Sequence, residues 1–345
     1  MLPRCSKYPC RMLKEMNAMK RFKDILCVLE PVKVCEPALE RAVTLAENNQ
    51  ACLTVVDVAP YVTVGIGMSD GGSGLANLQA AMVSIHKQRL EAFVEPFAKR
   101  VKIETKVLVG TPFLEIIREV LRNGRDLVIK VPEYQDWLER LFGSDDMHIL
   151  RKCPCPVWLI KSQAPKTHRV ILAAVDVDDT HQPQEMESRH ALNRQVLEMA
   201  SSLALAGAAE LHIVHAWNVL GEGSMRHGAF MNASESEVNA CVEQVRRQHE
   251  ANLDDLMCEV SANMGQDTLH YLKPQKHLVK GGARKEIPAL ARHIDADLVV
   301  MGTVARTGVS GFIMGNTAES ILNQIDCSVL ASKPPGFKTP VILDD

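Results

Sequence analysis

The sequence predicts an α/β protein built from two tandem halves, each a doubly wound parallel sheet of five strands. Short apolar runs of strand length alternate with longer helical stretches along the whole chain of 345 residues. An apolar run that ends in a carboxylate occurs at 24–30 and returns at 169–176, and the letters Asp-Leu-Val at 126–128 return at 297–299. The segment 162–167 between the two copies contains a proline and is interpreted as a linker.

The first half is expected to span residues 19–162, after a loose N-terminal tail at 1–18. An alternative for this tail is that translation begins at Met16 or Met19. The short apolar runs predict buried strands at 24–30, 51–58, 101–109, 126–131 and 156–161. The longer stretches between them predict helices at 36–49, 75–99, 112–123 and 145–152.

The second half is expected to span residues 163–335 and to be followed by a C-terminal tail at 336–345. The same patterns predict strands at 169–176, 209–216, 268–280, 296–302 and 328–332. They predict helices at 186–206, 234–264, 284–294 and 317–325. The glycine- and methionine-bearing segment 218–233 is expected to be a loop, and one interpretation of it is a lid over a cleft.

Composition narrows the classes of function. The net charge is −3, the pI is about 6.5 and no long basic run is present, which argues against nucleic acid or an anionic membrane as a partner. No apolar run reaches the ~18 residues that a membrane-spanning helix needs. Ten cysteines without a CxxC pair favour the reducing cytoplasm as the location of the protein.

The most informative segment lies near the end of the second half. The apolar run at 297–301 ends at Gly302, a loop with further glycines follows, and a helix is expected from residue 317. In α/β proteins, a strand followed by a glycine-spaced loop and a helix start directs backbone N–H groups outward, where they bind anions. The segment therefore predicts a protein that binds a small charged ligand.

Several segments taken together resemble the universal stress protein family. They are the strand end at 174–176, the loop and helix MGTVARTG…GNTAE within 301–319, and the Pro-Cys-Pro-Val entry to a final strand at 154–157. The loop spacing and the closing KPPGFKTPV tail at 333–341 are most similar to the tandem-domain bacterial branch of that family. The resemblance implies an adenine nucleotide alpha-hydrolase-like fold in both halves and a non-enzymatic, cytoplasmic role in the stress response.

The resemblance also implies a ligand site in the second half. ATP-binding members of the family carry a loop of the form G-x2-G-x9-G-[ST] and an aspartate that ends the first strand. The four loop positions are occupied here by Gly302, Ala305, Gly315 and Asn316, and the strand end is occupied by Asp176. A Cβ at Ala305 would cost roughly 1–2 kcal/mol if the loop needs a left-handed backbone there. Asn316 has two interpretations, a donor to the ligand or the N-cap of the following helix.

The expected ligand is ATP or another adenine nucleotide. The residues expected to bind it are Asp176, Met301, Gly302, Ala305, Arg306, Gly315, Asn316 and Thr317. The first half is not expected to hold ATP in this way, because residues 130–133 replace the first loop glycine. Within them Pro132 has no N–H group to offer, and Glu133 would repel a phosphate. Gly143 and Ser144 are interpreted there as a turn and a cap.

No catalytic or metal-binding residues are predicted. Nucleophile-elbow, zinc-helix and Walker-loop motifs are missing from the sequence, so any enzymatic activity is expected to be weak nucleotide hydrolysis near Asp176. His212 and His215 lie three apart on an expected strand, where they point to opposite faces and cannot readily share a metal. Cys153 and Cys155 are expected to be packing residues beside a final strand.

Two functions therefore stay open. The first is a stress-response protein that binds a nucleotide-like or phosphate-bearing ligand in its second half. The second is a scaffold or carrier whose second-half cleft holds an apolar ligand or a protein partner, with ATP binding lost, as Ala305 and the methionine-bearing stretch 221–231 suggest. The final strands at 157–160 and 329–331 would be exposed apolar edges, which predicts that the halves cover them as an intramolecular pseudo-dimer. A homodimer of two chains is a further expectation.

Overall fold

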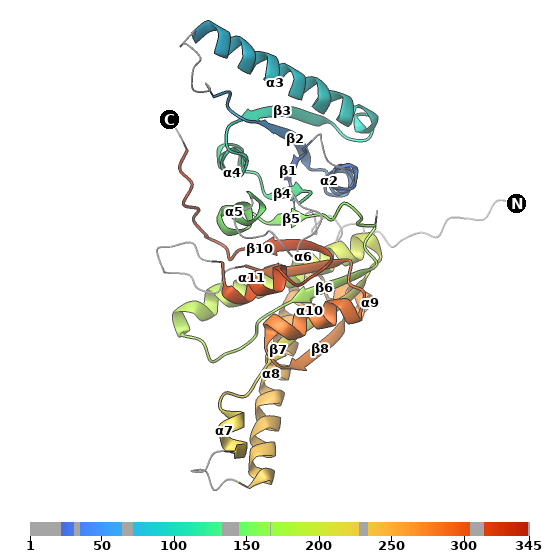
Figure 1. The fold of residues 1–345 in the computed structure, drawn as a ribbon. Coiled ribbons are helices and arrows are strands. Elements are labelled where there is room, and N and C mark those ends of the chain that lie inside the picture. Colours follow the sequence, from blue (N-terminus) through green and yellow to red (C-terminus); the bar gives the residue numbers. More distant parts are fainter. Residues whose placement is uncertain are drawn as a thin grey trace, which may run out of the picture. The chain divides into compact units, whose positions relative to one another are not determined.

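The computed structural model describes residues 22–30, 35–63, 72–132, 145–165, 167–227, 234–303 and 314–343. The chain divides into two compact units, the first made of Met1–Lys166 with Lys338–Asp345 and the second of Thr167–Phe337. Figure 1 shows that each unit is a sheet with helices on its two faces. The predicted α/β class with two tandem copies of one fold is confirmed.

The first unit contains a parallel sheet with the strand order β3-β2-β1-β4-β5. Its strands are β1 (Asp24–Val28), β2 (Cys52–Ala59), β3 (Ile103–Val109), β4 (Leu127–Lys130) and β5 (Val157–Leu159). Its helices are α2 (Glu36–Asn49), α3 (Gly72–Val94), the 3-10 helix η1 (Glu95–Phe97), α4 (Pro112–Asn123) and α5 (Asp145–Lys152). Right-handed crossovers place α2 and α3 on one face of this sheet and α4 and α5 on the other.

The second unit repeats this arrangement with the strand order β10-β9-β6-β7-β8, again all parallel. Its strands are β6 (Val170–Ala174), β7 (Glu210–Trp217), β8 (Gln275–Lys280), β9 (Leu298–Gly302) and β10 (Ser328–Ser332). Its helices are α6 (Pro183–Gly207), α7 (Glu222–His227), α8 (Glu235–Met264), α9 (Gln266–Leu272), α10 (Ala283–His293) and α11 (Asn316–Leu322). Helices α6 and α8 pack on one face, and α10 and α11 pack on the other.

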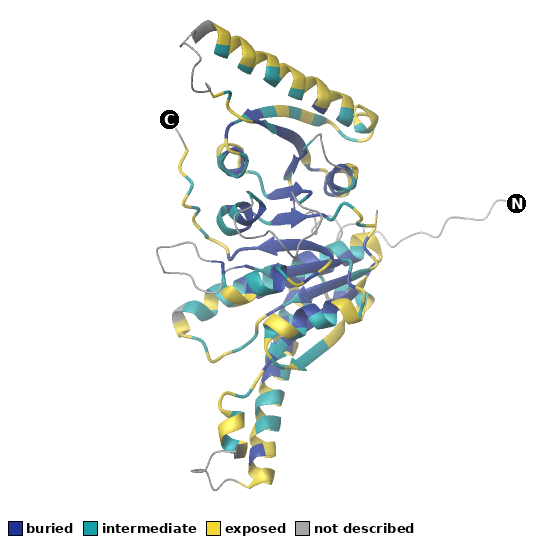
Figure 2. Cartoon of the chain, viewed as in Figure 1, coloured by how far each residue is buried: buried dark blue, intermediate teal, exposed yellow. Residues whose placement is uncertain are grey.

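The strand runs are apolar because helices cover both faces of each sheet. Every residue of β4, β5 and β10 is buried, and β1 and β9 are buried apart from one end residue each. Figure 2 shows these strands in the colour of buried residues. A parallel sheet that is buried on both faces results in each unit.

The predicted order of strands and helices is confirmed, with small shifts at element ends, but two parts of the second half differ. Residues 268–272 were expected to begin the strand 268–280, yet they belong to α9, and β8 begins only at Gln275. Their aromatic and β-branched letters favour a strand, but Leu269 is buried on a helix that ends before Pro274. Residues 222–227, expected in a loop, form α7.

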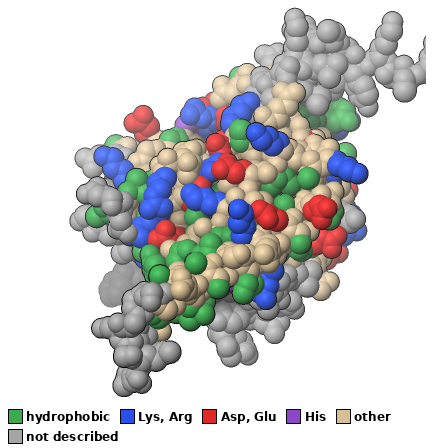
Figure 3. Space-filling model, turned by 90° about the horizontal axis from the view of Figure 1, so that it is seen from above, with side chains coloured by type: hydrophobic (Ala, Val, Ile, Leu, Met, Phe, Trp, Pro, Cys, Tyr) green, Lys and Arg blue, Asp and Glu red, His purple; other side chains and the backbone are tan. Residues whose placement is uncertain are grey.

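No helix in the described parts of the chain is long and apolar enough to cross a membrane. Figure 3 shows Lys and Arg side chains interspersed with Asp and Glu side chains on the described part of one face.

Candidate functional site

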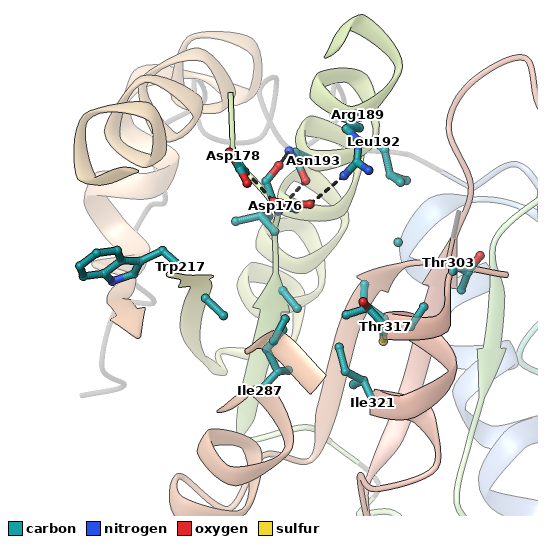
Figure 4. Close-up of a pocket in the computed structure, with 18 of the residues that line it drawn as sticks. Asp176, Asp178, Arg189, Leu192, Asn193, Trp217, Ile287, Thr303, Thr317 and Ile321 are labelled. Atoms are coloured by element: carbon teal, nitrogen blue, oxygen red, sulfur yellow. Dashed lines mark hydrogen bonds and ion pairs between the residues drawn. The ribbon is translucent and has the colours of Figure 1, made fainter. Parts of the chain in front are cut away.

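A cavity of about 360 Å³ opens at the carboxyl ends of the strands in the second unit. Strands β6 and β9 are neighbours in this sheet, and the chain leaves them toward opposite edges, so their carboxyl ends form the point where strand order reverses. Ligands of doubly wound sheets bind in the crevice at this point. Figure 4 shows residues that line the cavity. They are Ala174, Val175, Asp176, Asp178, His181, Arg189, Leu192, Asn193, Ala216, Trp217, Asn218, Gly281, Ala283, Ile287, Met301, Gly302, Thr303, Gly315, Thr317, Ala318 and Ile321.

The turn after β6 is held in place by a side chain from α6. The Asp176 backbone N–H donates to Asn193 Oδ1 at 3.0 Å, and Asn193 Nδ2 donates to the Asp176 carbonyl at 2.6 Å. Asn193 is 8% exposed, so water competes little for these two hydrogen bonds. The paired bonds fix the backbone of Asp176 and so direct its carboxylate along the cavity wall, as Figure 4 shows.

The Asp176 carboxylate is half-exposed and already has partners from the protein. Arg189 Nη1, also from α6, lies 2.8 Å from Asp176 Oδ2, and His181 Nε2 lies 3.6 Å from the same oxygen. The backbone N–H of Asp178 donates to Asp176 Oδ1 at 3.3 Å. Burial alone would raise the pKa of Asp178, but hydrogen bonds from the Thr180 amide and hydroxyl outweigh it and hold that pKa below its ordinary value. This edge of the cavity therefore carries two carboxylates, a guanidinium and an imidazole.

The opposite edge is made by the end of β9 and the start of α11. Gly315 is the N-cap of α11, and its N–H donates to the Thr303 carbonyl at 3.0 Å, so this amide is bound within the protein. The Thr303 hydroxyl donates to the Ser332 carbonyl at 3.2 Å. Thr317, the second residue of α11, lines the cavity and is exposed. Its hydroxyl is a donor and acceptor that a ligand can reach.

Gly302 ends β9 at a place where a larger residue would require Leu192 to move. A Cβ built on it would lie 2.5 Å from Leu192 Cδ2 and 3.0 Å from Leu192 Cγ, because α6 packs tightly over the strand end. The sequence interpretation assigned this glycine to a phosphate, but the close approach in the structure is made by Leu192.

Replacing Gly302 by alanine should therefore destabilise the second unit by about 1–3 kcal/mol through overpacking against Leu192. Chemical denaturation followed by hydrogen exchange of β9 peptides would measure this change. Gly74→Ala in α3 is the matched control, because nothing lies within 4 Å of its added Cβ, and no loss of stability is expected there. Equal stability of the two variants would contradict the packing role.

The wall between the two polar edges is apolar. It is formed by Trp217 from the end of β7, Ile287 from α10, Ile321 from α11 and Leu192 from α6. Figure 4 shows Ile287 and Ile321 on two different helices, both below Asp176 in this view. A ligand with one flat or apolar part and two separate polar ends would satisfy all three surfaces.

The structure brings most of the predicted site residues together. Of those predicted to bind the ligand, the ones that line the cavity are Asp176, Met301, Gly302, Gly315 and Thr317. Ala305 and Arg306 lie outside the described residues. Asn316 is exposed and is not among the lining residues. Its interpretation as the N-cap of α11 is wrong, because Gly315 holds that position and no side chain caps the helix.

Sequence reasoning missed the contribution of α6. Arg189 and Asn193 lie four residues apart on this helix, which places both on one face toward Asp176. A polar pair at this spacing, on the helix that follows the strand ending at Asp176, could have indicated that α6 contributes to the site. The predicted lid contributes little among its described residues, of which only Asn218 lines the cavity.

The first unit has a buried ion cluster at the corresponding corner. Lys130 pairs in register with Val28, as Met301 pairs with Ala174, so Lys130 occupies the place of Met301. Its side chain is 1% exposed, and its Nζ lies 2.8 Å from both Glu30 Oε1 and Asp146 Oδ1. Burial would lower the pKa of Lys130, but the two carboxylates outweigh it and raise that pKa. An internal cation thus occupies this corner, which supports the prediction that the first half does not hold ATP.

The remaining sequence predictions concern histidines and cysteines. His212 and His215 do point to opposite faces of β7, because His212 contacts His277 of β8 whereas His215 contacts His249 of α8. No group of three or more possible metal ligands occurs among the residues that the structure describes. Cys153 and Cys155 are both buried before β5, as expected of packing residues.

Comparison with known proteins identifies the family. Residues 21–161 and 169–333 match the Universal stress protein family. The chain is 31% identical to Universal stress protein E of Escherichia coli K12 over 95% of this chain and 99% of that protein. It is 28% identical to the Universal stress protein E homolog of Haemophilus influenzae over 91% of this chain and 98% of that protein. The predicted resemblance to the tandem-domain bacterial branch of the family is thereby confirmed, and universal stress protein E is the name of that branch.

Solved structures agree with this assignment. A functionally unknown protein from Pseudomonas aeruginosa PAO1 has a TM-score of 0.63 and 27% identity, covering 92% of this chain and 95% of its own. A universal stress protein from Archaeoglobus fulgidus has a TM-score of 0.55 at 19% identity, covering 90% of this chain and 97% of its own, and shows the shared fold. The chain belongs to the universal stress protein family, and it carries the family's domain twice.

Proposed function

We propose that the second unit binds a nucleotide-like or phosphate-bearing small molecule and does not turn it over. One observation carries this proposal. The cavity at the point of strand reversal joins the Asp176–Arg189 ion pair on one side to the hydroxyl of Thr317 and the glycine-spaced start of α11 on the other. Each polar edge contains a residue that the sequence predicted to bind the ligand, Asp176 on one edge and Thr317 on the other.

The charges of the cavity suggest how such a ligand would lie. Asp176 and Asp178 would repel a phosphate, so its place is at the Thr317 edge. A hydroxyl- or amine-bearing part would instead donate to the half-exposed Asp176 carboxylate. The apolar wall of Ile287 and Ile321 lies between these edges and suits the face of a base.

A second candidate function is an apolar carrier or scaffold. Two observations favour it: the Gly315 amide is already bound by the Thr303 carbonyl, and Leu192 fills the space beside Gly302. Both remove surface that a phosphate would use. The apolar wall would then accept an apolar ligand or a side chain of a protein partner, with ATP binding lost.

Calorimetric titration with ATP, and separately with AMP, tests the first proposal. Thr317→Val should weaken binding by about 1 kcal/mol, or roughly fivefold, because it removes a hydrogen bond without changing shape. Thr111→Val, at the exposed start of α4 in the first unit, is the matched control and should leave the affinity unchanged. Ala305→Gly should strengthen binding, because it removes the Cβ that departs from the family loop.

Undetectable binding of both nucleotides by the native chain and by Ala305→Gly would reject the nucleotide proposal. An apolar molecule retained through native mass spectrometry would then favour the carrier. Release of inorganic phosphate from ATP in a coupled assay would contradict binding without turnover.

Three further expectations belong to this proposal and remain predictions. The protein is expected in the cytoplasm, because ten cysteines without a CxxC pair favour a reducing compartment. The pairing of the two halves as a pseudo-dimer and the association of two chains into a homodimer are expected from the sequence. Solution scattering together with sedimentation would measure both.

A further inference from the structure

A pair of buried histidines lies directly beneath the turn that carries Asp176. His215 is the sixth residue of β7 and is 1% exposed, and His249 on α8 is 6% exposed. His215 Nε2 lies 3.0 Å from His249 Nδ1, so the two rings share a hydrogen bond. Because each of these nitrogens must take the opposite role, the hydrogen bond exists only while at least one of the two rings is neutral.

The other nitrogen of His215 meets the turn itself. Its Nδ1 lies 3.2 Å from the Val175 carbonyl oxygen and 3.4 Å from the Val177 backbone nitrogen. The carbonyl can only accept a hydrogen bond and the N–H can only donate one, so a proton on Nδ1 selects between them. The protonation state of His215 therefore decides which end of the turn it holds, and Val175 and Asp176 both line the cavity.

The surroundings of the pair are mixed in charge. The carboxylates of Asp176 and Asp178 face it from the turn, with Arg189 and His181 beside Asp176. From α8, Asn252 Nδ2 donates to the Val177 carbonyl at 3.0 Å, so this helix holds the turn at a second point. Burial lowers the pKa of His215 below its ordinary 6.5, although the Asp176 carboxylate opposes that change.

The first unit has an aspartate–histidine pair at the corresponding place, and these two groups do not repel each other. Strands β2 and β7 have equal length and the same burial pattern, and their sixth residues are Asp57 and His215. Asp57 Oδ2 lies 2.5 Å from Nδ1 of His86, which belongs to the helix that follows β2. A carboxylate attracts a protonated imidazole, whereas two imidazoles repel each other when both carry a proton. The pair that repels itself when both rings are protonated therefore belongs to the unit that contains the cavity.

We propose that the His215–His249 pair is a pH-sensitive support of the ligand cavity, which holds the 175–178 turn in its binding arrangement while neutral and releases it in acid, when the pair takes up protons. Because the folded protein binds the His215 proton less readily than the unfolded chain, the stability of this region falls as pH falls from 6.5 toward the lower folded value. The effect on ligand affinity rests on the proposed function, but the effect on the turn does not.

Hydrogen exchange of the full chain at pH 7.5 and pH 5.5, corrected for intrinsic rates, tests the support without any ligand. Peptides that cover 175–178 should exchange at least threefold faster at pH 5.5, whereas peptides that cover 24–30 of the first unit should not change. His215→Asp gives the second unit the pair of the first and should abolish the acid-induced increase. His249→Asn removes the repulsion between two protonated rings but leaves His215 able to take up a proton on Nδ1, so it should reduce the increase without abolishing it.

The proposal would be overturned if the exchange of 175–178 increased in both variants as much as in the native chain, or if it did not increase in the native chain. Titration with ATP at the two pH values provides the second arm, with severalfold weaker binding expected at pH 5.5 in the native chain but not in His215→Asp. If ATP binds at neither pH while the exchange difference persists, the proposed nucleotide function fails and the pH-sensitive support stands. Unchanged affinity with a persistent exchange difference would reject only the link between turn and ligand.

Discussion

Replacing Lys130 by methionine should lower the free energy of unfolding of the first unit by about 3–5 kcal/mol. The ammonium group is 1% exposed and holds Glu30 and Asp146, each at 2.8 Å. Without it, the buried Asp146 carboxylate and the partly exposed Glu30 carboxylate would lose the cation that lies between them. Methionine is the residue that the second unit has at this place, so the shape of the side chain is acceptable to the fold. The loss of stability would therefore measure the effect of removing the charge and not an effect of side-chain shape.

Hydrogen exchange of peptides from β1 and β4 measures this change locally, since two units need not unfold in one step. Lys87→Met is the matched control, because its side chain is 62% exposed and its ion pair with Glu91 should contribute less than about 1 kcal/mol. Combining Lys130→Met with Glu30→Gln and Asp146→Asn should restore most of the stability, because the two negative charges that Lys130 balances would be removed together with it. Equal losses in the single and triple variants would show that the cluster acts through packing instead.

The cluster also has a defined pH dependence. The pKa of Lys130 is raised in the folded protein, so its contribution is fully present below the ordinary value of 10.5 and is lost as pH rises above it. A cation that is part of the chain cannot dissociate, whereas a bound ligand can. The two units therefore differ at this place: Lys130 fills it in the first unit, whereas a cavity lies beside Met301 in the second.

The sequence predicted the parts of the fold that depend on periodicity. Apolar runs and the repeat located nearly all the strands, and the order of strands placed Asp176 beside Gly302. Residues 268–272 were mistaken for a strand because their propensities are β-like, whereas burial of Leu269 against the rest of the unit stabilises a helix. Local preference is a weak guide where tertiary packing opposes it.

The sequence predicted site residues within single segments of the chain, but not the contacts between side chains of different elements. Lys130 is buried, which a lysine at a strand end rarely is, so the sequence pointed to its neighbours Pro132 and Glu133 instead. Arg189 and Asn193 were missed because a helix shows which residues share a face but not which face meets the site. The role of Gly302 was assigned by family pattern, whereas its contact with Leu192 depends on how closely α6 approaches β9.

Replacing Asn193 by leucine should cost the second unit about 1–3 kcal/mol and reduce ligand affinity more than tenfold. Leucine fills a similar volume but offers nothing to the Asp176 N–H and carbonyl, which Asn193 now binds at 3.0 and 2.6 Å. Since the backbone at Asp176 sets the direction of its carboxylate, the loss would move the acidic edge of the cavity. The expected effect on affinity is therefore larger than that of removing one hydroxyl at Thr317.

Asn49→Leu separates the two effects. Asn49 is also 8% exposed, also lies on a helix and also donates to a backbone carbonyl, that of Leu45 at 2.9 Å, but it belongs to the first unit. Its loss should destabilise the first unit and leave titration with ATP unchanged, whereas Asn193→Leu should alter both the exchange of 175–178 and the titration. If both variants weaken ATP binding equally, affinity follows general stability and not the position of Asp176. If neither does, the nucleotide meets some part of the chain other than the turn that Asn193 holds, and the assignment of Asp176 to the ligand fails.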